Sequence, residues 1–161
     1  AAWGFDRARL RRIAELAQSR VERLSDLVPT AAYLFAGRIA VTKESFAGTK
    51  LSDDEIRKAL ALAMWRLDAE RVFDKATVED VLKGVAEALG KKFRELARPY
   101  YVAMTGSPTS LPLFDSMELL GRDIVRERFR VALDVLGGVS SKEQKEWQRI
   151  VPPDRPNGAA A

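Results

Sequence analysis

The chain has 161 residues, 47% of them hydrophobic and 31% charged, which is an ordinary balance for a globular protein of one large or two small domains. It contains no cysteine and no histidine, which excludes disulfides, thiolate metal sites, a cysteine nucleophile and the commonest general base and transition-metal ligand. These absences favour binding over catalysis, and the net charge of +4 is compatible with a polyanionic partner.

The first half of the chain has the pattern of helices. Apolar residues at positions 10, 13, 17, 21 and 24 recur every three or four residues and predict a helix over residues 6–24. Pro29 suits a first helical turn and predicts a short helix in "PTAAYLF", followed by a loop. Ser52, with Glu55 three residues later, forms a capping box that predicts the start of a helix reaching about Arg71.

The second half continues the helical pattern. A helix beginning at "TVED" is predicted to stop at Gly90, and Pro99 is predicted to restart a helix. The segments 112–120 and 122–136 predict two further helices, each followed by glycine. Residues 138–161 end in a run of proline, glycine and alanine and predict a flexible tail.

No motif in the chain carries a recognisable catalytic function. "GTKLS" lacks the upstream glycine of a phosphate-binding loop, and "TGSPTS" lacks its lysine. The acidic clusters at residues 53–55 and 79–80 lie in first helical turns, where the helix dipole favours acids; a carboxylate pair for hydrolysis or metal binding is the less favoured interpretation. We therefore predict no catalytic residue and no metal site.

Two long segments share the residue order of a known family. "LSDLVPTAAYLF" is followed, further along the chain, by "ARPYYVAMTGSPTSLPLFDSMELLGRDIVRERFRVAL". Together they resemble the C-terminal anticodon-binding region of bacterial glutamyl-tRNA synthetases. The resemblance extends from about Phe5 to Leu136, and its most specific part is Met104 to Asp123.

The resemblance implies an all-α fold of two small helical sub-bundles, residues 1–74 and 75–137, followed by the tail. It also implies that the chain is a fragment that binds the anticodon arm of tRNA for glutamate. The fragment would carry no cofactor, whereas the parent ligase would use ATP and Mg²⁺ on a domain outside this chain. We expect a cytoplasmic monomer. No membrane partner is expected, because no apolar run is long enough to span a bilayer, and no secretory pattern is present.

Arg20 is the residue that the resemblance assigns to specificity. In the family, an arginine at this place reads the third anticodon base, which is C for glutamate and G for glutamine. The pairing edge of cytosine offers two acceptors to a guanidinium, whereas that of guanine offers donors. Arg20 therefore predicts rejection of tRNA for glutamine, and the alternative is a solvated arginine at a helix end.

The resemblance assigns three more residues to the anticodon bases. Ser110 and Leu113 match positions that contact bases, although Leu113 could equally pack in the core. Tyr101 stands where many relatives have an arginine, and it could stack on a base, for about 1–3 kcal/mol, or pack in the core. Contacts with the RNA backbone are expected from Lys91, Lys92, Arg94 and Arg98.

Two other functions remain open at this stage. One is a relaxed-specificity member of the same family that accepts tRNA for glutamate and for glutamine, against which Arg20 argues. The other is a helical protein-interaction domain that has lost tRNA binding, which the low net charge and Tyr101 favour.

Overall fold

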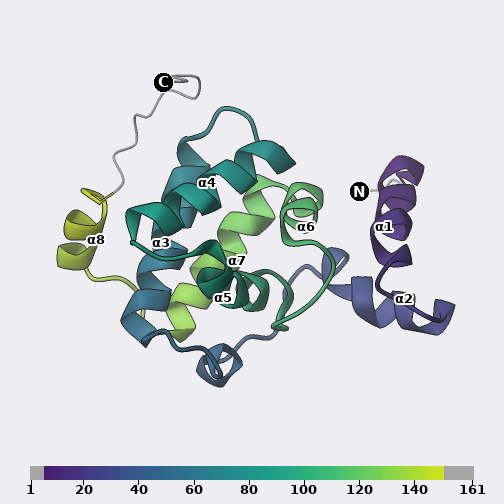
Figure 1. Cartoon of the computed structure of the whole chain (residues 1–161), viewed down its shortest axis with the longest axis horizontal. Helices are drawn as coiled ribbons and strands as arrows, with labels where there is room; N and C mark the ends of the chain where they lie inside the picture. The colour runs from purple at the N-terminus through teal and green to yellow at the C-terminus, as the bar shows by residue number, and fades with distance from the viewer. Residues whose placement is uncertain (1–5, 151–161) are drawn as a thin grey trace.

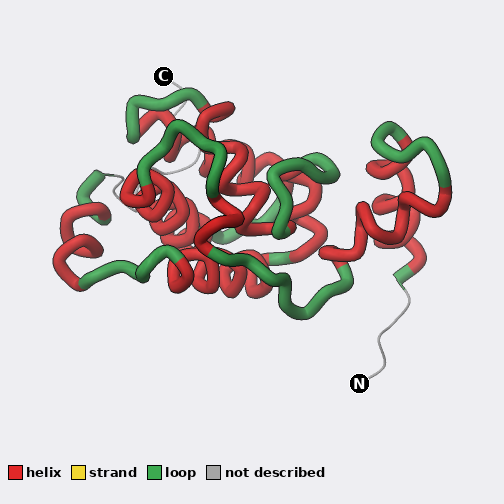
Figure 2. Tube along the Cα trace, turned by 90° about the horizontal axis from the view of Figure 1, so that it is seen from below, coloured by secondary structure: helices red, strands yellow, loops and turns green. Residues whose placement is uncertain are grey.

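The computed structural model describes residues 6–150, in which every regular element is a helix (Figures 1 and 2), so the predicted all-α fold is confirmed. None of these helices is long and apolar enough to span a membrane. In chain order the elements are α1 (Arg7–Gln18), α2 (Leu24–Ala31), the 3-10 turns η1 (Ala32–Leu34) and η2 (Lys43–Phe46), α3 (Asp53–Ala69), α4 (Lys75–Ala88), α5 (Phe93–Thr105), α6 (Leu113–Leu120), α7 (Arg122–Val135) and α8 (Ser141–Trp147).

Local sequence sets the ends of several helices. The Ser52 hydroxyl accepts a hydrogen bond from the N–H of Glu55 at 3.2 Å, and the Glu55 carboxylate accepts one from the N–H of Ser52 at 2.8 Å. The predicted capping box at the start of α3 is therefore confirmed. α6 ends at Leu120, and Gly121 follows with a φ of 82°, in the left-handed region that glycine adopts at little cost.

Two prolines that were expected to begin helices lie inside them. α2 begins at Leu24, five residues before Pro29, and α5 runs unbroken through Pro99. A proline inside a helix removes one N–H and leaves the carbonyl four residues earlier without its helical partner. Here those carbonyls belong to Ser25 and Glu95, whose residues are exposed, so water can satisfy them and the helices continue.

The first predicted helix is shorter than expected. α1 ends at Gln18 instead of reaching residue 24, and a turn connects it to α2. Leu24, which the periodicity placed on the buried face, is 87% exposed. Regular spacing of apolar residues continues across this turn, so spacing alone does not reveal the break.

α3 is the central helix of the fold. Its residues from Ala59 to Ala63 are all buried, so it is enclosed on more than one side, and it packs against α4, α5 and α7. α1 packs against α2 at the edge of the molecule (Figure 1). The division between residues 74 and 75 stays a prediction of domain organisation, and the packing of α3 crosses it.

A buried arginine connects three segments of this bundle. Arg128 of α7 is 3% exposed, and its guanidinium donates hydrogen bonds to the carbonyls of Tyr33 at 2.7 Å, Ala36 at 2.9 Å and Met104. These carbonyls belong to η1, the loop after it and the end of α5. Because each acceptor lies on a different segment, one side chain fixes their relative positions.

The segment after residue 138 is folded as far as residue 150, which corrects the expectation of a flexible tail beginning at 138. α8 opens with a capping box between Ser140 and Glu143, and Trp147 is buried. Arg57 and Lys58 of α3 lie over the Trp147 ring, 5.5 and 5.7 Å from its centroid. The remaining tail, residues 151–161, lies outside the described residues.

We expect Arg128→Met to lower the free energy of unfolding by about 3 kcal/mol or more, because each carbonyl left without its donor costs about 1–3 kcal/mol. Urea denaturation measures this loss. The matched control is Arg130→Met, which removes an exposed arginine of the same helix and should cost less than about 1 kcal/mol. Equal losses in the two variants would contradict the connecting role of Arg128.

The docking of α8 should weaken in acid. The backbone N–H of Ser140 and then the guanidinium of Arg57 lower the pKa of Glu143 from 4.5 to about 2. Since the folded pKa lies below the unfolded one, this stabilisation is complete above pH 4.5 and is lost as the pH falls towards 2. The indole N–H resonance of Trp147 reports the change. In Glu143→Gln this pH dependence should disappear, whereas in the control Glu146→Gln it should persist.

Candidate functional site

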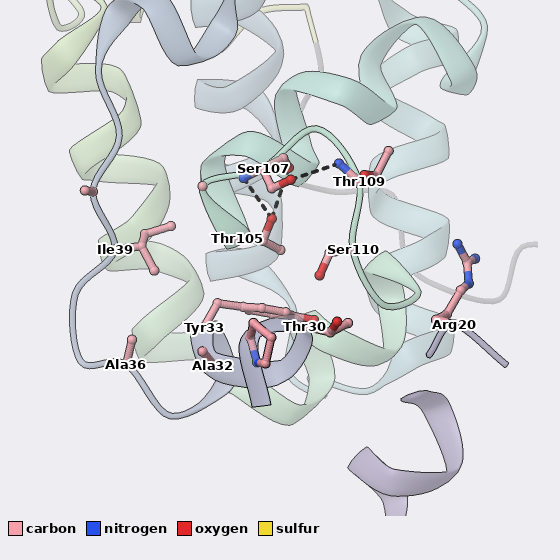
Figure 3. Close-up of a pocket in the computed structure, with 13 residues that line it drawn as sticks. Arg20, Thr30, Ala32, Tyr33, Ala36, Ile39, Thr105, Ser107, Thr109 and Ser110 are labelled. Atoms are coloured by element: carbon pink, nitrogen blue, oxygen red, sulfur yellow. Dashed lines mark hydrogen bonds between the residues drawn. The ribbon is translucent and has the colours of Figure 1, made fainter. Parts of the chain in front are cut away.

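A groove of about 700 Å³ opens between the α2–η1 segment and the loop that follows α5. Figure 3 shows Arg20 at one end of this groove, Ile39 at the other and Tyr33 between them. The volume lies in the range of sites that accept small organic groups. Much of the polar lining consists of hydroxyl groups, from Thr30, Tyr33, Thr105, Ser107, Thr109 and Ser110.

The floor of the groove is a buried chain of hydroxyls. The Tyr33 hydroxyl lies 2.6 Å from that of Ser116, which in turn donates to the carbonyl of Pro112 at 2.7 Å. Burial raises the pKa of Tyr33, and hydrogen bonds with Ser116 and Ser110 oppose that rise only in part. Tyr33 is therefore a neutral phenol that holds η1 against the start of α6.

The loop over the floor is held by Thr105. Its hydroxyl lies 2.9 Å from the carbonyl of Tyr101 and 3.0 Å from that of Ser107, and it accepts a hydrogen bond from the N–H of Ser107 at 3.1 Å (Figure 3). Gly106 follows α5 with a φ of 77°, which lets the chain turn back over the groove. The loop thus presents short polar side chains and backbone on a defined frame.

Arg20 is placed by the docking of α1. The Arg12 guanidinium contacts the carboxylates of Asp115, at 3.2 Å, and Glu118 on α6, and Arg9 donates to the carbonyl of Leu34 at 3.2 Å. α1 ends two residues before Arg20, so these contacts set the position of Arg20 at the rim. Within residues 6–150 no hydrogen bond or ion pair involves its side chain, so its donors remain available to a ligand.

The structure brings Arg20 and Ser110 to one groove, although ninety residues separate them in the sequence. Leu113, which was expected beside them, is 4% exposed and packs in the core at the start of α6. It offers a base almost no surface in this conformation. The short polar residue of this corner therefore faces the groove, while the leucine supports it from beneath.

Tyr101 lies near the groove without lining it. Its ring is half-buried against the core, and its carbonyl lies 2.9 Å from the Thr105 hydroxyl. Tyr100, its neighbour, is fully buried, and its hydroxyl donates to the carbonyl of Ala59 at 3.4 Å. Adjacent helical residues point in different directions, so only one of the pair reaches the periphery.

None of the four basic residues expected at the RNA backbone lines this groove. Lys91 forms an ion pair with Glu55 at 2.8 Å and, with the backbone N–H of Ser52, lowers the pKa of that carboxyl to about 2. Arg98 donates to the carbonyl of Ala47 at 3.2 and 2.9 Å. Lys92 and Arg94 are exposed at the start of α5, a helix about 20 Å long whose other end borders the groove.

Sequence reasoning missed Arg128, which lies behind the groove. A signal was present, because Arg128 falls three residues after Val125 and so shares the face on which Val125, Phe129 and Ala132 are buried. An arginine on the apolar face of a helix indicates a buried guanidinium that requires acceptors. Among the described residues no group of three or more acidic side chains could hold a metal ion.

Comparison with known proteins identifies the class of protein to which this helical chain belongs. Residues 1–133 match the family described as "Anticodon binding domain", and the chain belongs to that family. The resemblance found in the sequence is therefore confirmed.

The similar proteins are glutamate–tRNA ligases. The chain is 37% identical over 149 residues to those of Pseudomonas putida (strain W619) and Stutzerimonas stutzeri (strain A1501), with 92% of this chain and 30% of each relative covered. It thus spans about a third of the length of these relatives. A crystal structure of a glutamate tRNA ligase from Elizabethkingia meningosepticum, in complex with its amino acid, shares the fold. It matches with a TM-score of 0.70 at 15% identity, over 80% of this chain and 25% of that one.

We expect Gly106→Ala to lower stability by about 1–2 kcal/mol, because a Cβ disfavours its left-handed backbone. The added Cβ would also lie 3.3 Å from the carbonyl oxygen of Ala40, another residue that lines the groove. Gly90→Ala is the matched control, since Gly90 has a φ of 65° and open space around it. Both variants should be destabilised in thermal unfolding, but only Gly106→Ala should speed amide exchange at Ser107 and Thr109. Unchanged exchange there would show that the loop does not depend on this close approach.

Proposed function

We propose that this chain is the anticodon-binding part of a glutamate–tRNA ligase and that the groove holds the anticodon bases of tRNA for glutamate. The observation that carries the proposal is the convergence of Arg20 and Ser110 on one groove of about 700 Å³ in a chain of the anticodon-binding family. The names of the similar proteins, glutamate–tRNA ligases, supply the amino acid and the class of RNA in this proposal.

The groove suits an unstacked base. Bases in single-stranded loops are recognised on their exposed edges by short polar side chains and backbone groups, with apolar or aromatic surface against their faces. The loop from Thr105 to Ser110 supplies the first kind of contact, and Ile39 with Ala36 supplies apolar wall. Contacts of this kind can recognise a base without any catalytic group.

Arg20 is the residue that we propose distinguishes glutamate from glutamine anticodons. Its guanidinium carries five N–H donors and no acceptor, which suits the O2 and N3 acceptors of cytosine and not the N–H donors of guanine. Arg12 links α1 to α6, so the end of α1 next to Arg20 is held in place. The guanidinium of Arg20 therefore loses less conformational freedom when it binds a base.

Catalysis would take place outside this chain. The relatives extend well beyond the part that matches, since the chain covers 30% of their length. We propose that ATP and Mg²⁺ act on that remaining part, and that Arg20 and Ser110 contribute to the choice of tRNA.

The test is the affinity of the chain for two tRNA transcripts that differ only in the third anticodon base, C or G, measured by fluorescence anisotropy at low salt. We expect G to weaken binding about 5- to 150-fold, equivalent to the 1–3 kcal/mol of a good bidentate base contact. Arg20→Gln should remove most of this discrimination by weakening binding of the C transcript.

Arg23→Gln is the matched control, because it removes an exposed arginine three residues away that does not line the groove. It should keep the ratio of the two affinities. If the ratio of the C and G affinities is the same in the unaltered chain and in both variants, Arg20 does not have its proposed role. If the unaltered chain binds no tRNA, the proposed function itself is overturned.

A further inference from the structure

A second, smaller hollow of about 250 Å³ lies on the other side of the loop that ends the groove. It is bounded by residues 37–41 and by one face of α7. Ile39 lines both hollows, so a chain that leaves the groove at the end marked by Ile39 in Figure 3 arrives at this one. Neither Arg20 nor Ser110 takes part in it.

The second hollow carries a positive charge. Arg38, Arg128 and Arg130 line it together with a single acid, Glu127, which leaves a net charge of +2. The Glu127 carboxylate is already engaged, because the Arg130 guanidinium donates to it at 3.0 and 2.8 Å and lowers its pKa, with a further contribution from Arg38. No second carboxylate is available among the lining residues to balance Arg38 and Arg128.

Arg128 makes this charge unusual. It is 3% exposed, its partners are carbonyl oxygens instead of carboxylates, and its Nε has no hydrogen-bond partner among the described residues. Buried charges are normally paired, because desolvation of an unpaired ion is costly; here burial lowers the pKa of Arg128. The field of an unneutralised charge is also screened less inside a protein than in water, so it favours an anion in the adjacent hollow.

We propose that this hollow binds a phosphate group of the RNA backbone next to the base that occupies the groove. The proposal rests on the proposed function, which brings RNA to the groove. Arginine suits a phosphate because its planar fork donates two parallel hydrogen bonds to phosphate oxygens. Arg38 is exposed at the rim and supplies these donors, because the fork of Arg130 already donates to Glu127. Arg128 supplies a fixed charge from beneath.

The first experiment measures how tRNA affinity depends on salt. Each phosphate contact adds about 0.7 to the slope of log K against log salt concentration for a single strand. We expect Arg38→Gln to reduce this slope by about 0.7 and to weaken binding of the C and G transcripts by the same factor. Arg149→Gln is the matched control, because this exposed arginine follows α8 at the opposite side of the molecule from α2 (Figure 1), and it should leave the slope unchanged.

The second experiment removes the charge from the RNA. A neutral methylphosphonate is placed at one linkage at a time in the anticodon loop of the C transcript. We expect one position to weaken binding to the unaltered chain, and we expect Arg38→Gln to be insensitive to the same change. Titration of inorganic phosphate, followed by NMR at the backbone amide of residue 38, shows whether the hollow also takes free phosphate. A saturable shift in the unaltered chain that is absent from Arg38→Gln identifies a general phosphate site. No shift in the unaltered chain means that the hollow takes phosphate only as part of RNA.

The outcomes separate this proposal from the proposed function. If tRNA binds with the expected preference for C but Arg38→Gln behaves as Arg149→Gln in both experiments, the phosphate site is overturned and the groove stands. If the unaltered chain binds no tRNA but inorganic phosphate shifts the Arg38 amide, the proposed function fails and the hollow remains an anion site.

Discussion

The guanidinium of Arg128 is the contact on which the arrangement of the groove depends. Its three carbonyl acceptors lie on η1, on the loop after η1 and at the end of α5, which are the segments that carry the groove's walls. An apolar side chain at this place would fill space but would leave those carbonyls unpaired. The width of the groove thus follows from hydrogen bonds that α7 makes with main chain from two distant parts of the sequence.

Different residues hold the frame of the groove and face its open space. Tyr33, Ser116 and Thr105 are bonded to one another or to backbone and hold the frame, whereas Arg20 reaches the rim with its donors unused in the described part of the chain. A rigid frame with a few free polar groups suits recognition of a splayed base, because little ordering is needed when the ligand arrives. The proposed phosphate site beyond Ile39 would continue this surface from a contact with a base to a contact with the RNA backbone.

Local patterns predicted much of the secondary structure, and they failed where packing decides. The capping box at Ser52 and the stop at Gly121 depend on neighbouring residues alone, and both are as predicted. Pro29 lies inside α2 instead of beginning a helix, because the exposed helix turn before it tolerates a lost hydrogen bond. α8 lies within the segment that was predicted to be a flexible tail, because a short polar helix has little stability of its own and is held by the contacts of Trp147 with α3.

The sequence by itself determined the all-α class, the family and the absence of histidine and cysteine chemistry, because residue order and composition carry these directly. It also pointed to Arg20 and Ser110, through the resemblance. Only the tertiary structure decided that these two share a groove, that Lys91 is paired with Glu55 and Arg98 with the carbonyl of Ala47, and that Arg128 is buried beside a positive hollow. The physical reason is that charge and hydrogen-bond availability depend on which segments meet in space, and no local pattern specifies that meeting.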